Sequence, residues 1–124
     1  MKYLLDTQIF LWALDKDSNL KQLVRRIIIN PNIIIYISLV SIWEMSIKRK
    51  IGKLDLKYKL RTYVDKSGFD LLNINLDHII TLDKLPLHHR DPFDRLLVAQ
   101  AKTEKLTLIT ADPKMKKYDV KLLI

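Results

Sequence analysis

Four short segments of this 124-residue sequence carry a carboxylate beside an apolar run or at the start of an expected helix. The segments are Leu4-Leu5-Asp6-Thr7, Ile42-Trp43-Glu44, Asp91-Pro92-Phe93-Asp94-Arg95 and Thr110-Ala111-Asp112-Pro113. Three of the four adjoin runs typical of buried strands or core helices, where an unpaired negative charge is energetically expensive. A divalent cation would offset that expense. Carboxylate oxygens suit magnesium or manganese, and carboxylate clusters that hold these ions commonly cut or transfer phosphodiesters.

Each acid also has a local structural explanation. Glu44 stands three residues after Ser41, which is the spacing of a capping box at a helix start. Asp91 precedes Pro92 as an N-cap residue would, and Asp94 then falls at the third helical position, where the helix dipole favours an acid. Taken singly, these acids indicate capping as readily as function.

The other two acids differ in how well capping explains them. Asp112 before Pro113 fits a turn or the start of a short helix, but Asp6 has the weakest local explanation, because Thr7 could cap the next helix without it. Only the joint pattern favours a functional site, with catalytic candidates Asp6, Glu44, Asp94 and Asp112.

Hydrophobic periodicity divides the chain into alternating strands and helices. The expected strands are 3–5, 33–37, 69–74, 106–109 and 120–124, and the expected helices are 9–14, 20–28, 41–50, 58–66, 76–82 and 92–101. The alternation predicts an α/β sandwich whose helices flank a mainly parallel sheet of about four or five strands. No repeat or linker interrupts it, so residues 1–124 are expected to form one domain.

This fold would bring the four acids together. In parallel sheets, ligands bind beyond the carboxyl ends of the strands, where the strand order reverses. Asp6 and Asp112 directly follow expected strands, and Glu44 and Asp94 lie in the first turns of expected helices. We therefore expect all four at one edge of the sheet.

The charge balance favours a polyanionic partner. Lysine and arginine total 22 against 14 acids, which gives a net charge of +8. If several acids gather in one site, the remaining surface is more positive still, as nucleic-acid binding requires. Genomic base bias or simple solvation also explains a lysine-rich composition.

Cysteine usage and hydropathy bear on location. The chain has no cysteine, which excludes a disulfide framework and a thiolate zinc site and favours the cytoplasm. The first residues run directly into a strand pattern, so we expect no export signal. The most apolar stretch, 27–43, is interrupted by Asn30-Pro31-Asn32 and two serines, which leaves no segment long enough to cross a bilayer.

Several other chemistries lack their residues. Gly52 and Gly68 are the only glycines, too few for a P-loop or a dinucleotide fingerprint. A phosphatase with an aspartyl nucleophile would carry a second acid two residues after Asp6, where this chain has Gln8. No serine sits on a glycine-flanked elbow.

The histidines and tryptophans receive structural interpretations. His88 and His89 adjoin on a loop, where neighbouring side chains seldom point the same way, and neither they nor His78 are expected to bind metal. Trp12 and Trp43 lie on apolar helical faces and are expected in the core.

Basic residues near the acids have two interpretations each. Arg95 follows Asp94 directly and could bind a substrate phosphate or form a structural ion pair. The densest basic group is either a substrate-binding patch or a solvated helix end, and it comprises Lys48, Arg49, Lys50 and Lys53.

At these segments the sequence resembles the PIN-domain ribonucleases, and most closely the VapC toxins of type II toxin–antitoxin systems. The most specific stretch is His89-Arg90-Asp91-Pro92-Phe93-Asp94-Arg95-Leu96-Leu97-Val98-Ala99-Gln100-Ala101. The resemblance implies a PIN-like three-layer sandwich, an acidic quartet at Asp6, Glu44, Asp94 and Asp112, and support from Asp91, Thr7, Thr110 and Arg95. Gln8 departs from the His, Asn or Ser that relatives often carry there.

The resemblance implies an endoribonuclease that leaves a 5′-phosphate and a 3′-hydroxyl. Asp6, Asp94 and Asp112 would ligate one or two Mg²⁺ or Mn²⁺ ions, and Glu44 would orient the attacking water. Expected partners are an RNA substrate such as transfer RNA, a second copy in a homodimer, and a cognate VapB-like antitoxin. The antitoxin would dock on apolar helical faces within 20–28 and 42–51.

Two alternatives stay open at this stage. A non-catalytic module could keep the fold, hold RNA or a protein on its basic face, and tolerate neutralisation of Asp94. A structure-specific DNA nuclease would use the same metal chemistry, although this short chain lacks extra helical elements to thread a flap.

Overall fold

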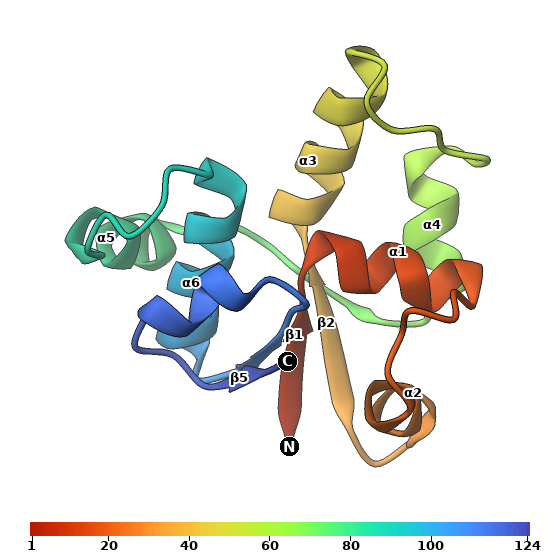
Figure 1. The fold of residues 1–124 in the computed structure, drawn as a ribbon, viewed down its shortest axis with the longest axis horizontal. Coiled ribbons are helices and arrows are strands. Elements are labelled where there is room, and N and C mark those ends of the chain that lie inside the picture. The colour runs from red at the N-terminus through yellow and green to blue at the C-terminus, as the bar shows by residue number, and fades with distance from the viewer.

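A fully parallel, five-stranded sheet forms the centre of the protein in a computed structural model that describes residues 1–124 (Figure 1). The strands are β1 (Lys2–Leu5), β2 (Ile34–Ser38), β3 (Asp70–Leu72), β4 (Thr107–Ile109) and β5 (Leu122–Leu123). Their spatial order is β3-β2-β1-β4-β5, and every neighbouring pair is parallel. The predicted α/β architecture is confirmed.

Helices cover both faces of this sheet. They are α1 (Thr7–Asp15), α2 (Gln22–Ile29), α3 (Leu39–Lys50), α4 (Leu60–Ser67), α5 (Leu76–Lys84), α6 (Pro92–Glu104) and a short 3₁₀ helix, η1 (Pro113–Lys117). None combines the length and apolarity needed to span a membrane. Figure 1 shows α1, α2 and α4 on one side of the strands and α5 and α6 on the other, so the predicted three layers are present.

The two faces of the sheet pack into separate hydrophobic clusters, because successive strand side chains point to opposite sides. In β1, Tyr3 and Leu5 join the cluster that contains α1, α2 and α4, whereas Leu4 joins the cluster that contains α6. Ile109 and Leu108 of β4 divide between the clusters in the same way. Strands buried on both faces are near-continuous apolar runs, and the sequence pattern located them for that reason.

The strand order reverses at β1, which pairs with β2 on one side and with β4 on the other. The helix α1 leaves β1 toward one face, while α6, which leads into β4, covers the opposite face. Helices that diverge in this way open a crevice at the carboxyl ends of the strands, the usual ligand position in parallel sheets.

Several element boundaries differ from the prediction by a few residues, and two of these differences have a clear structural cause. The helix expected from Ser41 begins at Leu39, because Ser38 at the end of β2 caps it by accepting a hydrogen bond from the Val40 amide at 3.0 Å. The strand expected over 69–74 contracts to Asp70–Leu72, since β3 is an edge strand that pairs only with β2.

Trp43 is not in the core, contrary to the prediction. Its side chain is 51% exposed and packs edge-to-face on Phe93, with ring centroids 4.9 Å apart. Figure 1 shows α3 standing above the carboxyl edge of the sheet, so only part of its circumference can meet the core. Trp12 is half-buried against the first cluster, as expected.

A buried polar network fixes α5 and α6 to the end of β2. The Nε2 of His78 lies 2.9 Å from Glu104 Oε2, and its Nδ1 accepts from the Asn75 amide at 3.2 Å. Gln100 accepts from the Ser38 hydroxyl at 2.5 Å and lies 3.3 Å from His78 Nδ1. Both ring nitrogens of His78 therefore have partners, and its structural interpretation is confirmed.

We expect Leu4→Ala to lower the free energy of unfolding by about 2–5 kcal/mol, because it leaves a cavity beside a fully buried central strand. Leu76→Ala is the matched control: Leu76 is 71% exposed, so the loss there should stay within about 0.5 kcal/mol. Urea unfolding followed by circular dichroism measures both. Equal losses for the two variants would contradict this placement of β1.

Candidate metal centre

Asp6 follows β1 directly and is the N-cap residue of α1. Its Oδ1 accepts a hydrogen bond from the Ile9 amide at 2.8 Å, and the side chain is buried. Burial raises the pKa of Asp6 to about 6; hydrogen bonds from Thr110 and Ile9 oppose this rise, and the negative charges of Glu44 and Asp112 add to it. The hydrogen bonds to Asp6 therefore do not fully offset the cost of burying its negative charge.

Glu44 reaches two side chains from α3. Its Oε1 accepts from the Thr7 hydroxyl at 2.5 Å, and its Oε2 pairs with Lys48 Nζ at 2.5 Å. The hydrogen bond to Glu44 raises the pKa of Lys48. The capping-box explanation of Glu44 is wrong, because Ser41 lies inside α3 and Ser38 caps the helix instead. Asp6 caps α1, so Thr7 is not needed as a cap and its side chain can face Glu44.

The start of α6 agrees with the prediction. Asp91 is the N-cap residue and accepts from the amides of Phe93 at 2.9 Å and Asp94 at 3.0 Å, and Pro92 occupies the first helical position. Burial raises the pKa of Asp94 to about 7, and the negative charges of Asp91 and of other acids nearby add to the rise. A group with this pKa needs a positive partner to stay ionised.

Asp112 begins the short helix that the sequence allowed after β4. Its Oδ1 accepts from the Lys114 amide at 2.9 Å, and its own amide donates to the Thr110 hydroxyl at 3.0 Å. Thr110 is buried at the end of β4. The Thr110 hydroxyl thus supports Asp112 directly, and its proximity to Asp6 lowers the pKa of that carboxyl.

One cleft of about 280 Å³ brings these carboxylates together. Its acidic lining consists of Asp6, Glu44, Asp91, Asp94 and Asp112. Lys48 and Lys53 also line it, but only Lys48 forms an ion pair there. Carboxylate oxygens in excess of cations, with raised pKa values at Asp6 and Asp94, fit Mg²⁺ or Mn²⁺.

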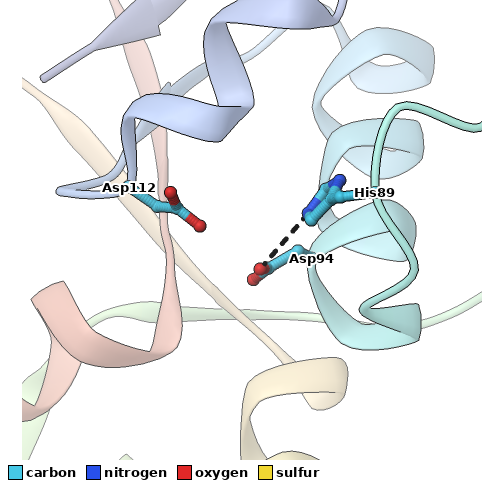
Figure 2. Close-up of side chains that lie close together, drawn as sticks. All are labelled: His89, Asp94 and Asp112. Carbon is cyan, nitrogen blue, oxygen red and sulfur yellow. Dashed lines mark ion pairs between the residues drawn. The ribbon is translucent and has the colours of Figure 1, made fainter.

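The sequence interpretation missed His89. Its Nε2 lies 3.5 Å from Asp94 Oδ2, and the ligand atoms of His89, Asp94 and Asp112 all lie within 4.8 Å of one another. Figure 2 shows the imidazole and the Asp94 carboxylate facing each other while Asp112 extends toward them. His88, in contrast, is exposed. The one sequence feature that could have pointed to His89 is its position two residues before Asp91, the N-cap residue of α6.

Arg95 does not line the cleft. Its Nη1 donates to Pro86 O at 2.8 Å and to Tyr118 Oη at 3.2 Å. These partners are neutral oxygens, so the structure gives Arg95 neither the expected ion pair nor a place beside the acids. It instead ties the loop before α6 to the segment after η1.

A parallel sheet with carboxylates gathered at its switch point defines a class of α/β proteins equipped to bind a divalent metal. Residues 3–121 match the PIN domain, and the chain therefore belongs to the PIN domain family. The comparison with curated proteins gives no match.

Solved structures with the same fold include toxin–antitoxin complexes. VapBC2 from Rickettsia felis, bound to a promoter DNA fragment, has a TM-score of 0.76 at 21% identity, covering 99% of this chain and 98% of that one. DNA-bound VapBC from Salmonella typhimurium has a TM-score of 0.73 at 14% identity, covering 99% and 97%. A toxin–antitoxin complex from Klebsiella pneumoniae has a TM-score of 0.68 at 22% identity, covering 98% and 96%.

Neutralising Asp94 should stabilise the metal-free protein at high pH. The carboxyl of Asp94 has a pKa of about 7 in the folded protein and of 3.8 in the unfolded chain. Between about pH 4 and about pH 7 the unfolded chain therefore releases a proton that the folded protein keeps, and the free energy of unfolding falls as the pH rises. We expect Asp94→Asn to raise the free energy of unfolding by about 1–2 kcal/mol at pH 8 in EDTA, with the gain vanishing toward pH 4.

Urea unfolding at several pH values measures this effect. Asp77→Asn, which changes an exposed acid on α5, is the control and should show no comparable pH-dependent gain. An Asp94→Asn protein that is less stable than the wild type at pH 8 would contradict the conclusion that ionised Asp94 destabilises the metal-free fold.

Proposed function

We propose that this protein is a metal-dependent endoribonuclease that acts as the VapC-type toxin of a toxin–antitoxin pair. The observation that carries the proposal is the gathering of five carboxylates from four separate segments in one cleft at the switch point of the sheet. Membership of the PIN domain family supports nuclease chemistry. The toxin–antitoxin complexes that share the fold support a place in such a pair.

Asp6, Asp94 and Asp112 are the proposed metal ligands. When bound, Mg²⁺ or Mn²⁺ would lower the pKa of the attacking water and neutralise charge developing on the phosphate. The Oδ1 atoms of Asp6 and Asp112 each accept a backbone N–H, which leaves the second oxygen of each carboxylate for the cleft. The backbone therefore orients two of the three ligands before any ion arrives.

Glu44 has a different proposed role. Both of its oxygens have partners, Thr7 and Lys48, so it acts by positioning these groups and by orienting the attacking water. The Lys48 ammonium and exposed Lys53 lie at the same cleft and would contact phosphates of the RNA on either side of the scissile bond.

The proposed reaction is a hydrolysis. The oxygen of a water molecule attacks phosphorus while the bond from phosphorus to the 3′ oxygen breaks. The water loses a proton to solvent or to a carboxylate of the cleft, and the departing 3′ oxygen gains one. The products carry a 5′-phosphate and a 3′-hydroxyl, and transfer RNA is the proposed substrate class.

Exposed apolar side chains support docking of an antitoxin. On α2, Leu23 is 53% and Ile29 77% exposed, and on α3, Trp43 is 51% exposed, with Ile51 just beyond the helix at 59%. The other apolar residues of α2, Val24, Ile27 and Ile28, lie in the core or pack against it, as does Leu20 just before the helix. We propose these exposed side chains as antitoxin contacts, with a homodimer in the cytoplasm as the working assembly.

Asp94→Asn and Asp6→Asn should each lower RNA cleavage by at least about 100-fold, because each removes a proposed metal ligand. Asn retains the capping ability of Asp at position 6, so the fold should persist. Asp77→Asn, on the exposed side of α5, is the matched control and should cleave normally. EDTA should abolish cleavage by the wild type, and added Mg²⁺ or Mn²⁺ should restore it.

The same variants can be induced in a bacterial host while growth and new RNA 5′ ends are recorded. We expect growth arrest and discrete 5′-phosphate ends from the wild type and from Asp77→Asn alone. Equal arrest by Asp94→Asn would favour the non-catalytic binding module. Cleavage of DNA but not RNA in vitro would favour the DNA nuclease.

Cleavage should rise steeply between about pH 5 and pH 8, because protons compete with the metal for Asp6 and Asp94, whose pKa values are about 6 and about 7. Since this is a competition, a tenfold increase in Mg²⁺ should move the midpoint of the profile to lower pH. Initial rates measured at two metal concentrations test both points. A flat profile over this pH range would count against metal binding by these acids.

A further inference from the structure

His89 places a nitrogen atom at the rim of the carboxylate cluster. The Nε2 atom is itself buried and has no hydrogen-bond partner, although Asp94 Oδ2 lies 3.5 Å away. Its side chain is 14% exposed, so solvent has little access to the ring. A buried polar atom without a partner is unfavourable unless something else satisfies it.

The ring is held in this orientation from behind. His89 Nδ1 lies 2.8 Å from Tyr118 Oη, and the His89 amide donates to the same oxygen at 3.4 Å. Tyr118 is buried and also accepts from Arg95 Nη1 at 3.2 Å. Metal-binding histidines usually donate their second N–H to an acceptor, which orients the ring and leaves the first nitrogen free. The tautomer in which Nδ1–H donates to Tyr118 Oη meets this requirement and leaves the lone pair of Nε2 for a metal ion.

His78 provides an internal comparison with a structural histidine. It is fully buried, and each of its ring nitrogens has a partner, Glu104 at 2.9 Å and the Asn75 amide at 3.2 Å. His89 has a hydrogen-bond partner on one nitrogen only, and the other faces Asp94, at ion-pair distance, and Asp112 (Figure 2). This asymmetry is typical of a ligand and not of a core histidine.

We infer that His89 Nε2 is a direct metal ligand, together with Asp94 and Asp112, so that the centre is of mixed nitrogen and oxygen type. This inference rests on the metal-dependent activity proposed above. Adjacent ligands of an octahedral ion with bonds of about 2.1 Å are about 3 Å apart and opposite ligands about 4.2 Å. The observed 3.5 Å between His89 Nε2 and Asp94 Oδ2 falls between these two spacings. All three ligand atoms lie within 4.8 Å of one another, so a small inward movement of the side chains would complete the coordination.

A nitrogen ligand changes which ion the centre prefers. Mg²⁺ takes oxygen ligands almost exclusively, whereas affinity for imidazole rises from Mn²⁺ through Co²⁺ and later ions of the first transition series. The all-carboxylate site expected from the sequence has a weaker bias of this kind. With His89 bound, the protein should favour Mn²⁺ and Co²⁺ over Mg²⁺ beyond what its carboxylates alone provide.

Pulsed electron paramagnetic resonance of Mn²⁺ tests the inference without a substrate. The full chain, freed of any histidine tag, is loaded with Mn²⁺ alone, and the spectrum is searched for coupling to a ¹⁴N nucleus. We expect this coupling in the wild type and in His88→Gln, which changes the exposed neighbour, and we expect His89→Gln to lose it. Tyr118→Phe, which removes the oxygen beside Nδ1, should retain the coupling but bind Mn²⁺ more weakly.

Titrations of metal affinity give the second readout. His89→Gln should weaken Mn²⁺ binding at least tenfold and Mg²⁺ binding less than threefold, while His88→Gln should change neither. Equal weakening for the two ions would indicate a merely structural role and overturn the inference. Absence of ¹⁴N coupling in Mn²⁺-loaded wild type, or its persistence in His89→Gln, would overturn it also.

The proposed function fails in a different way. If Asp94→Asn binds Mn²⁺ as tightly as the wild type, the acids are not the ligands and the metal-dependent nuclease is wrong as well. If Asp94→Asn loses Mn²⁺ while His89→Gln retains normal affinity, the carboxylate centre stands and only the nitrogen ligand is rejected.

Discussion

The burial of mutually repelling carboxylates in one cleft is the constraint that the rest of this structure has to satisfy. Asp6 and Asp94 both have raised pKa values, and in each case burial is the largest cause. Such repulsion persists only where the surrounding scaffold determines the position of every acid. Here the scaffold is β1, buried on both faces, together with the helices α1 and α6 that two separate hydrophobic clusters hold to opposite sides of the sheet.

Helix capping and the proposed metal centre use the same side chains. The sequence presented capping and function as rival explanations for Asp91 and Asp112 and gave Asp6 the weakest capping explanation, yet all three cap a helix and line the cleft. A carboxylate has two oxygens, and a backbone N–H needs only one of them. The N-cap therefore orients the acid, and the positive end of the helix dipole lessens the cost of its charge.

The sheet and the gathering of the four acids Asp6, Glu44, Asp94 and Asp112 in one cleft were predictable from local patterns. Buried parallel strands are apolar runs, and Asp6, Asp94 and Asp112 have fixed offsets from strand or helix ends. His89 was not predictable, because its orientation depends on Tyr118, 29 residues away. The exposure of Trp43 also escaped prediction, since periodicity identifies an apolar helical face but not how much of the helix stands beyond the sheet.

The capping role of the acids has an evolutionary consequence. Asn caps a helix about as well as Asp, so one nucleotide change in an Asp codon can remove a negative charge while the helix start keeps its shape. Under the proposed function, a single mutation at Asp6 or Asp112 would thus yield a folded, inert protein that still displays the surfaces its antitoxin recognises. Escape from toxicity would then leave behind a decoy that sequesters antitoxin, and not merely a null allele.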